Sequence, residues 1–251
     1  MQSMANNTVS LSILLNKLGC PASVTPCTRE HIKQLKLRDE IAAFKRHQSQ
    51  KLDKLSGKSG LNKRFLACTF DNYYTRLAGQ VKAVDIAQEY VRRFVELASL
   101  GKGFLFTGTP GTGKNHIASA IANELIAKHH SVMLMSVMDL FARARESYGY
   151  NHLTEGHLLS EFLEPDLLII DEIGLQRGSR DELLWFTRIL DKRLYANKPT
   201  GFVTNLDQKA LQQLLGERAY QRLQDAVSVM VKFDWQSYRG KKRTTCDLRG
   251  K

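Results

Sequence analysis

The chain has little of what marks secreted or membrane proteins. Its 251 residues include only four cysteines, and none of these forms a C-x-x-C pair. Their spread does not suggest a disulfide framework. The longest apolar runs, such as LLII at 167–170, are far shorter than the ~20 residues that a membrane-spanning helix needs. The early segment VSLSILL lacks the basic flank and small-residue cleavage site of a secretory signal. We therefore expect a cytoplasmic protein with no membrane partner.

One group of residues near the start resembles a metal site. Cys20, Cys27 and His31 form C-x6-C-x3-H, which could supply three zinc ligands. The first spacing is wider than the usual C-x2–4-C of zinc sites. Reduced thiols without a metal are therefore the favoured interpretation.

Positive charge is abundant and unevenly placed. The whole chain has a net charge of +12. Residues 1–69 carry +8 and residues 236–251 carry +5, whereas the 166 residues between them carry −1. This asymmetry indicates that a phosphate-rich polymer or an acidic partner meets the ends of the chain. Basic ends that only keep the protein soluble are the alternative.

Two helices are expected in the first part of the chain. Leucines recur at helical spacing over 11–18, and a second basic helix is predicted over 28–55. The second helix has only a narrow apolar stripe, so it should dock on a partner or lie against the rest of the protein. The Gly, Ser and Lys-rich run at 56–64 is typical of a linker.

From about Cys68 onward, helical patterns alternate with short apolar strands. The strands lack polar alternation, and this indicates a parallel sheet covered by helices on both faces. The fold class is therefore α/β. The five predicted strands are GFLFTG at 103–108, SVMLMS at 131–136, DLLIID at 166–171, TGFVTN at 200–205 and VSVMVKF at 227–233.

The run GTPGTGKN follows the first of these strands and opens a helix. It matches the phosphate-binding pattern G-x-x-x-x-G-K-[ST] except at its last position. The glycines let backbone N–H groups point inward, and the lysine would neutralise the β- and γ-phosphates of ATP. The candidate nucleotide contacts are Gly108, Thr109, Pro110, Gly111, Thr112, Gly113, Lys114, Asn115 and His116.

Polar residues follow two other strands of the predicted sheet. Asp171 and Glu172 end the strand LLII, where ligands collect in open α/β sheets. Asp171 suits a carboxylate associated with Mg²⁺, and Glu172 suits the base that orients an attacking water. Asn205 follows the next strand and could hold that water and sense the γ-phosphate.

Asn115 stands where the general pattern has a hydroxyl that holds Mg²⁺. Its carbonyl oxygen is a hard, neutral ligand, though longer and differently aimed. Either that oxygen binds the metal after a small shift, or the metal keeps an extra water. Both alternatives permit ATP binding and slow hydrolysis, which suits a switch better than a motor.

With these motifs in place, the chain resembles the bacterial replicative helicase loaders, the DnaC family of AAA+ ATPases. The similarity runs from TFDNYYT at 69–75 to FDWQSYRG at 233–240, through GTPGTGKNHIA, DLLIIDEIG, KPTGFVTN and LLGERAYQR. It implies a helical, basic, helicase-binding region at 1–68 and an AAA+ ATPase domain with a five-stranded parallel sheet at 69–251.

The resemblance also implies roles for residues outside the phosphate loop. Phe70 and Tyr73 would pack against the adenine. In the GERxxxR run, Arg218 and Arg222 are candidates for the finger that reaches the neighbouring subunit's γ-phosphate, with Arg222 favoured, and Arg239 would contact phosphates in its own subunit. A finger acting in trans requires subunits stacked head to tail in a ring or spiral.

A basic and aromatic stretch lies between the second and third predicted strands. Arg143, Arg145, Tyr148 and Tyr150 are interleaved there, as in proteins that bind single-stranded DNA. In the family that this chain resembles, the corresponding region faces the DNA. A helix with a solvated arginine face and tyrosines packed on the core is an equal alternative.

The sequence therefore predicts an ATP-dependent loader that delivers a hexameric replicative helicase onto single-stranded DNA. Its cofactors would be ATP and Mg²⁺. A transposition helper ATPase of the IstB type is the main alternative, because it shares the same body. A small-molecule kinase fits less well, since it has little use for the acidic pair, and a module that binds ATP without hydrolysing it remains possible because of Asn115.

Overall fold

The computed structural model describes residues 36, 38, 66–146, 155–176 and 178–238. In the first 65 residues it describes only Lys36 and Arg38, both helical and exposed. The helix predicted at 11–18 lies outside the described residues, and so does the helix predicted at 28–55 apart from these two residues. The candidate zinc ligands Cys20, Cys27 and His31 also lie outside them. Residues 66–146, 155–176 and 178–238 are called the body of the protein.

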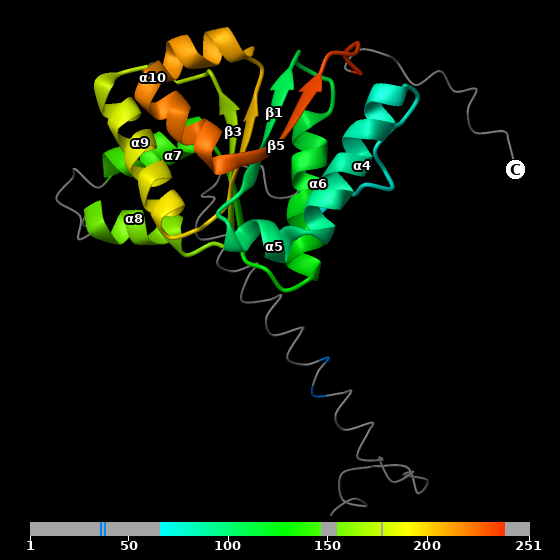
Figure 1. The fold of residues 1–251 in the computed structure, drawn as a ribbon, viewed down its shortest axis with the longest axis horizontal. Helices are drawn as coiled ribbons and strands as arrows, with labels where there is room; N and C mark the ends of the chain where they lie inside the picture. The colour runs from blue at the N-terminus through cyan, green and yellow to red at the C-terminus, as the bar shows by residue number, and fades with distance from the viewer. Residues whose placement is uncertain (1–35, 37, 39–65, 147–154, 177, 239–251) are drawn as a thin grey trace, which may run out of the picture. The chain divides into compact units, whose positions relative to one another are not determined.

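A five-stranded sheet forms the centre of the body, in the order β2-β3-β4-β1-β5 (Figure 1). Neighbouring strands are parallel throughout. All five strands predicted from the sequence are confirmed, with small differences at their ends. Their bounds are β1 Gly103–Gly108, β2 Val132–Ser136, β3 Leu167–Ile173, β4 Thr200–Thr204 and β5 Val227–Phe233.

Helices cover both faces of the sheet, as its apolar strands require. Alternate residues of a strand enter opposite clusters: Phe104 packs with α4, α5 and α6, whereas Leu105 packs with α7 to α10. The helices are α4 Ala78–Arg92, α5 Phe94–Ser99, α6 Lys114–Ala127, α7 Val137–Glu146, α8 Glu155–Leu163, α9 Arg180–Tyr195 and α10 Gln208–Ala226. None of the described helices is both long and apolar enough to cross a membrane.

The strand order places a binding crevice at the carboxyl edge of the sheet, where the strands end. The chain leaves β1 through α6 to reach β2, an outer strand, and it later returns through β3 and β4 to lie beside β1. The connections after β1 and after β3 cover opposite faces of the sheet. Ligands bind at such a reversal, beyond the carboxyl ends of parallel strands.

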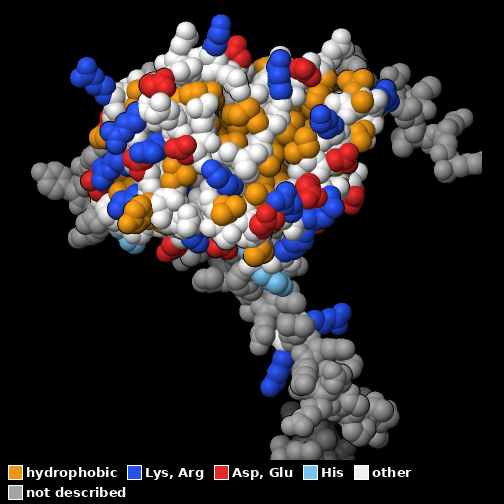
Figure 2. All heavy atoms as spheres, in the orientation of Figure 1, with side chains coloured by type: hydrophobic (Ala, Val, Ile, Leu, Met, Phe, Trp, Pro, Cys, Tyr) orange, Lys and Arg blue, Asp and Glu red, His pale blue; other side chains and the backbone are white. Residues whose placement is uncertain are grey.

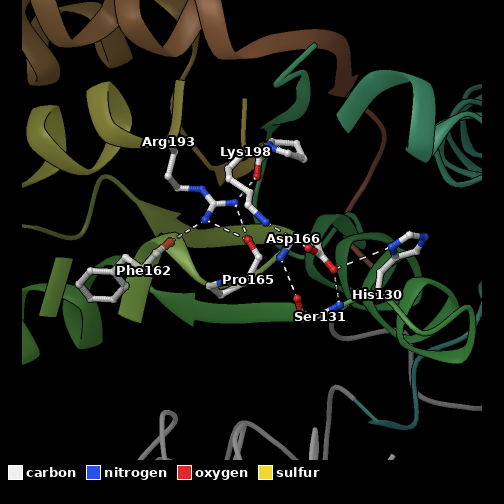
Figure 3. Close-up of polar contacts among 8 residues, drawn as sticks. His130, Ser131, Phe162, Pro165, Asp166, Arg193 and Lys198 are labelled. Atoms are coloured by element: carbon white, nitrogen blue, oxygen red, sulfur yellow. Dashed lines mark hydrogen bonds and ion pairs between the residues drawn. The ribbon is translucent and has the colours of Figure 1, made fainter. Parts of the chain in front are cut away.

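At the amino edge of the sheet, where the strands begin, a buried arginine joins the segments that precede β3 and β4 (Figure 3). Arg193 of α9 is only 1% exposed. Its guanidinium donates to the carbonyl oxygens of Phe162, Pro165 and Pro199, at 2.5 to 3.2 Å, and to the hydroxyl of Thr200 at 3.0 Å. Burial lowers the pKa of Arg193 to about 9, and the carbonyl acceptors compensate for part of the lost hydration.

Acidic and basic side chains are interspersed on the face of the body seen in Figure 2, without one dominant patch of either sign. This agrees with the near-neutral balance of residues 70–235, which carry −1. The charge excess of the chain lies outside those residues.

Candidate nucleotide site

The glycine-rich loop lies between β1 and α6 and turns with the backbone conformations that its glycines allow. Gly108, Gly111 and Gly113 have φ values of 128°, 79° and 95°, a region that favours glycine. A Cβ on Gly113 would lie 2.5 Å from the ring of Tyr73, and one on Gly108 would lie 2.1 Å from the carbonyl oxygen of Phe233. Both the conformation and the space therefore require glycine at these two positions.

Lys114 is the buried cation of this loop. Only 3% of the residue is exposed. Its Nζ donates to the carbonyl oxygens of Gly108 at 2.8 Å and Thr109 at 2.7 Å. The ammonium group is therefore already desolvated inside the loop, where a bound phosphate would add acceptors of full negative charge.

The loop forms one wall of a cavity of about 530 Å³, within the usual range for small-molecule sites. Residues from five separate parts of the body meet here, and they include the predicted lysine, acidic pair and sensor. The lining residues are Asn72, Tyr73, Tyr74, Gln80, Pro110, Gly111, Thr112, Gly113, Lys114, Asn115, His116, Asp171, Glu172, Val203, Thr204, Asn205 and Tyr238.

The acidic pair sits on a bulge at the end of β3. The register between β3 and β4 shifts between Ile170 and Ile173, and Glu172 has a positive φ of 58°. Bulges and strained residues of this kind concentrate at functional sites. The bulge turns Asp171 and Glu172 toward the cavity, with Asp171 buried and Glu172 exposed.

Burial raises the pKa of Asp171 to about 6, and the nearby Glu172 carboxylate adds to the rise. Hydrogen bonds and the Lys114 cation oppose it. A bound cation would favour the charged form and pull the pKa back down. The cavity thus contains a carboxylate whose charge is costly unless a cation lies beside it.

Asn115 contacts Asp171 directly. Its side-chain Nδ2 donates to Asp171 Oδ2, and the backbone N–H of Glu172 donates to Asp171 Oδ1 at 2.6 Å. Both carboxylate oxygens of Asp171 therefore accept a hydrogen bond. The side-chain oxygens of Asn115 and Asp171 are suitable ligands for Mg²⁺, which would neutralise phosphate charge when bound. The Nδ2 group of Asn115, however, competes with the metal for one oxygen of Asp171.

Asn205 directly follows β4 and lines the same cavity as the acidic pair. The preceding Thr204 is 1% exposed, and its hydroxyl donates to the carbonyl oxygen of Ile173 at 2.5 Å. It also accepts a hydrogen bond from the N–H of Leu206 at 3.0 Å. The ends of β3 and β4 are thereby joined, so Asn205 and the acidic pair are held in a fixed relation.

The two residues predicted to pack against adenine lie differently. Tyr73 lines the cavity, with its hydroxyl donating to the carbonyl oxygen of Thr112 at 3.0 Å and its ring edge-on to His116. Burial raises the pKa of Tyr73 to about 12. Phe70 does not line the cavity but packs against the α4, α5 and α6 side of the core, so its contact with adenine stays a prediction.

The segment after β5 completes the site, and sequence reasoning missed its aromatic residues. Trp235 Nε1 donates to the carbonyl oxygen of Thr112 at 2.9 Å, and the backbone N–H of Tyr238 donates to that of Gly111 at 2.8 Å. The aromatic residues in FDWQSY were the available signal. Arg239, the predicted phosphate contact in this run, lies outside the described residues.

The predicted finger arginines lie away from their own cavity. Arg222 Nε is 2.6 Å from Asp191 Oδ1, and Arg218 Nη2 is 3.8 Å from Asp191 Oδ2. Neither arginine lines the nucleotide cavity of its own chain. Any phosphate that they contact would have to come from another molecule or another arrangement of the chain.

The predicted DNA contacts on α7 are engaged in ion pairs within the body. Arg143 Nη1 lies 2.9 Å from Glu161 Oε2, and Arg145 Nη1 lies 3.6 Å from Glu182 Oε1. These pairs join α7 to α8 and α9. Tyr148 and Tyr150 lie outside the described residues, so a role for this region in binding DNA stays a prediction.

A parallel sheet of this strand order, a glycine-rich loop with a buried lysine after β1 and an acidic pair after β3 define the class. The body is a nucleotide-binding P-loop domain of the AAA+ type.

Comparison with known proteins specifies the family. The family model of the IstB-like ATP binding protein matches residues 69–245. The replicative helicase loader DnaC of Buchnera aphidicola subsp. Baizongia pistaciae is 39% identical over 80% of this chain and 80% of its own length. The Escherichia coli K12 loader DnaC is 34% identical over 88% of this chain and 91% of its own. The chain belongs to the DnaC family of replicative helicase loaders, within the IstB-like ATP-binding proteins.

A solved structure confirms the fold. The crystal structure of a DnaC helicase loader superimposes with a TM-score of 0.60 at 23% identity, covering 68% of this chain and 99% of the other. The fold class and family predicted from the sequence are both confirmed.

Proposed function

We propose that this protein is an ATP-dependent loader that delivers a hexameric replicative helicase onto single-stranded DNA. One observation carries the proposal: Lys114, the acidic pair and Asn205, predicted separately from the sequence, line the same cavity. The names of the relatives indicate what that cavity controls. The output of such a protein is mechanical, so nucleotide binding and hydrolysis serve to change its assembly.

Each residue of the cavity has a role that its geometry supports. The loop amides and Lys114 bind the phosphates, and Tyr73 with His116 borders the base. Asp171 and Asn115 hold Mg²⁺. Glu172, exposed to the cavity at the bulge, orients and deprotonates the attacking water, while Asn205 fixes that water and senses the γ-phosphate.

Assembly supplies what one chain lacks. Arg222 lies outside its own cavity, which supports a role in trans on the nucleotide of a neighbouring subunit. Head-to-tail contacts of this kind form a ring or a spiral. Hydrolysis should therefore be slow in dilute protein and accelerate as subunits assemble.

The basic region at 1–68 is the proposed contact with the helicase. A pull-down of replicative helicase by the full chain and by a chain lacking residues 1–68 tests this division. Retention by the full chain alone supports it. Equal retention by the truncated chain would place the helicase contact on the body.

ATP turnover measured with and without single-stranded DNA tests the nucleotide chemistry. We expect E172Q to bind ATP normally and to lose about 100-fold in turnover, because a general base contributes about that much. The wild-type chain should also deliver helicase onto a single-stranded circle when ATP is present. Tight ATP binding without turnover by the wild type would indicate a module that binds but does not hydrolyse.

A transposition helper of the IstB type is the second candidate, since the IstB-like family model covers 69–245. Such a protein works on duplex DNA with a transposase. Stimulation of turnover by duplex DNA in preference to single strands, with no helicase retained, would favour it.

A further inference from the structure

The carboxylate of Asp191 lies at the centre of the group that contains the candidate finger. Asp191 belongs to α9, and its side chain is 35% exposed. It is 2.6 Å from Arg222 Nε through Oδ1 and 3.8 Å from Arg218 Nη2 through Oδ2. The two arginines stand one helical turn apart on α10, so a single carboxylate from α9 faces both of them.

The two arginines are held differently. The Arg218 side chain is 78% exposed, whereas that of Arg222 is 43% exposed. The Nε atom of Arg222 is buried and has no aligned hydrogen-bond acceptor, so its contact with Asp191 is an attraction between charges without hydrogen-bond direction. The Nη1 atom of Arg222 lies 3.6 Å from Asp225. Arg222 is thus held at Nε by the charge of Asp191.

The backbone under these arginines is fixed. Gly216 interrupts α10 with φ 71° and ψ 165°, and the helical segment after it carries Arg218 and Arg222. Its other face is buried through Ala219, Tyr220, Leu223 and Ala226, in the cluster that also contains residues of α9. The segment therefore cannot rotate freely, and the direction of Arg222 depends on its side-chain torsions.

We infer that Asp191 is a positioning residue that aims Arg222 at the nucleotide of the neighbouring subunit. This inference rests on the proposed function, in which Arg222 acts in trans. Without such a contact, a partly exposed arginine would sample several rotamers, and ordering it would cost conformational entropy each time subunits meet. A carboxylate at Nε restricts those rotamers and leaves Nη2 to pair with phosphate oxygens, and Nη1 can join it by leaving the weaker contact with Asp225.

A mixing experiment assigns the two roles of neighbouring subunits to two variants. The K114A variant is the donor, because it keeps its arginine finger but loses its phosphate site. The R222A variant is the acceptor, because it keeps its phosphate site but loses its finger. Each alone should turn over ATP slowly, and the mixture should recover activity if the finger acts in trans. Replacing the donor by K114A/D191N should lower the plateau turnover about tenfold at saturating donor, with an unchanged KM for ATP.

Placement of the substitution is the control. The same D191N change put into the acceptor, as R222A/D191N, should leave the mixture with the K114A donor as active as before, because the acceptor has no finger to aim. A K114A/D191E donor should recover part of the loss, since a carboxylate is restored. A purely structural role for Asp191 would lower activity from either side.

The outcomes distinguish the two proposals. No recovery when K114A and R222A are mixed would overturn the trans role of Arg222 and, with it, the inference about Asp191. Recovery that is equal for K114A and K114A/D191N donors would overturn the inference alone. Equal losses from donor and acceptor substitutions would also overturn it, as would a higher donor requirement with an unchanged plateau.

Discussion

The two edges of the sheet each bury one cation, and they treat it differently. Lys114 at the carboxyl edge is 3% exposed and Arg193 at the amino edge is 1% exposed. Lys114 contacts two carbonyl oxygens of a loop built on glycines with positive φ and borders a cavity. Arg193 donates to the carbonyl oxygens of Phe162 and Pro165 in the α8–β3 connection and of Pro199 before β4, and Figure 3 shows its contacts with Phe162 and Pro165.

This difference separates binding from stability. A cation beside a cavity can exchange its carbonyl partners for the phosphates of a ligand, so its charge-assisted hydrogen bonds contribute to binding. A cation enclosed by the fold has no such exchange, and its hydrogen bonds hold the chain together instead. The same kind of group therefore serves different purposes because of what surrounds it.

The largest effect is expected at the amino edge. Replacing Arg193 by methionine keeps much of its bulk but removes the guanidinium that donates to the carbonyl oxygens of Phe162 and Pro165. We expect a loss of about 3 kcal/mol in the free energy of unfolding, measured by urea denaturation. R193K should lose less, because an ammonium still donates. Similar stability of R193M and the wild type would contradict a structural role for this arginine.

The matched substitution at the carboxyl edge should affect binding instead. We expect K114M to lower ATP affinity about 100-fold, because a charge-assisted contact to phosphate is lost, while its unfolding free energy changes by less than that of R193M. Fluorescent-nucleotide titration gives the affinity. If K114M binds ATP as tightly as the wild type, the phosphates do not lie at this loop.

Asn115 offers a finer test of the carboxyl edge. Its amide donates to Asp171, so the metal must compete with it. We expect N115T to increase the ratio of ATP affinities measured with Mg²⁺ and with EDTA about tenfold, since a hydroxyl oxygen replaces the competing amide. N115A separates the alternatives: a larger ratio identifies release of Asp171 as the cause, and a smaller one identifies the amide oxygen as a ligand.

Local patterns in the sequence were sufficient for much of the carboxyl edge. The strands β1 and β3 contain short apolar runs, and the functional residues directly follow those runs, so GTPGTGKN and DE could be assigned to one edge. Trp235 was missed because its contact with the loop joins residues far apart in the chain.

The amino edge could not be predicted in the same way. Arg193 lies in RDELLWFTRILDKRLY among other charged residues and has the pattern of a helix surface. It is buried because carbonyl oxygens of Phe162 in α8, of Pro165 before β3 and of Pro199 before β4 meet it in three dimensions. The contacts of Asp191 could not be predicted for the same reason, since its partners lie on the next helix.

The smallest effect is expected in the pH dependence of stability, at the two aspartates that flank the apolar run LLII. Burial alone would raise the pKa of Asp166, but hydrogen bonds from Ser131 and the contact with Lys198 hold that pKa below its ordinary value. Burial raises that of Asp171 to about 6. A raised folded-state pKa means that stability is lost as pH rises through that value, whereas a lowered one means that stability is lost only in more acidic solution.

We therefore expect the two Asp→Asn substitutions to differ in their pH dependence in nucleotide-free protein with EDTA. D171N should gain on the order of 1 kcal/mol over the wild type as pH rises from 4.5 to 7.5, because it removes a buried charge. D166N should be less stable than the wild type by an amount that is constant over this range, because that carboxylate stays ionised in both states. Urea denaturation at four pH values measures both. A D171N curve parallel to the wild type would show that Asp171 has an ordinary pKa, and the carboxyl edge would then lack the electrostatic demand for a cation that distinguishes it from the amino edge.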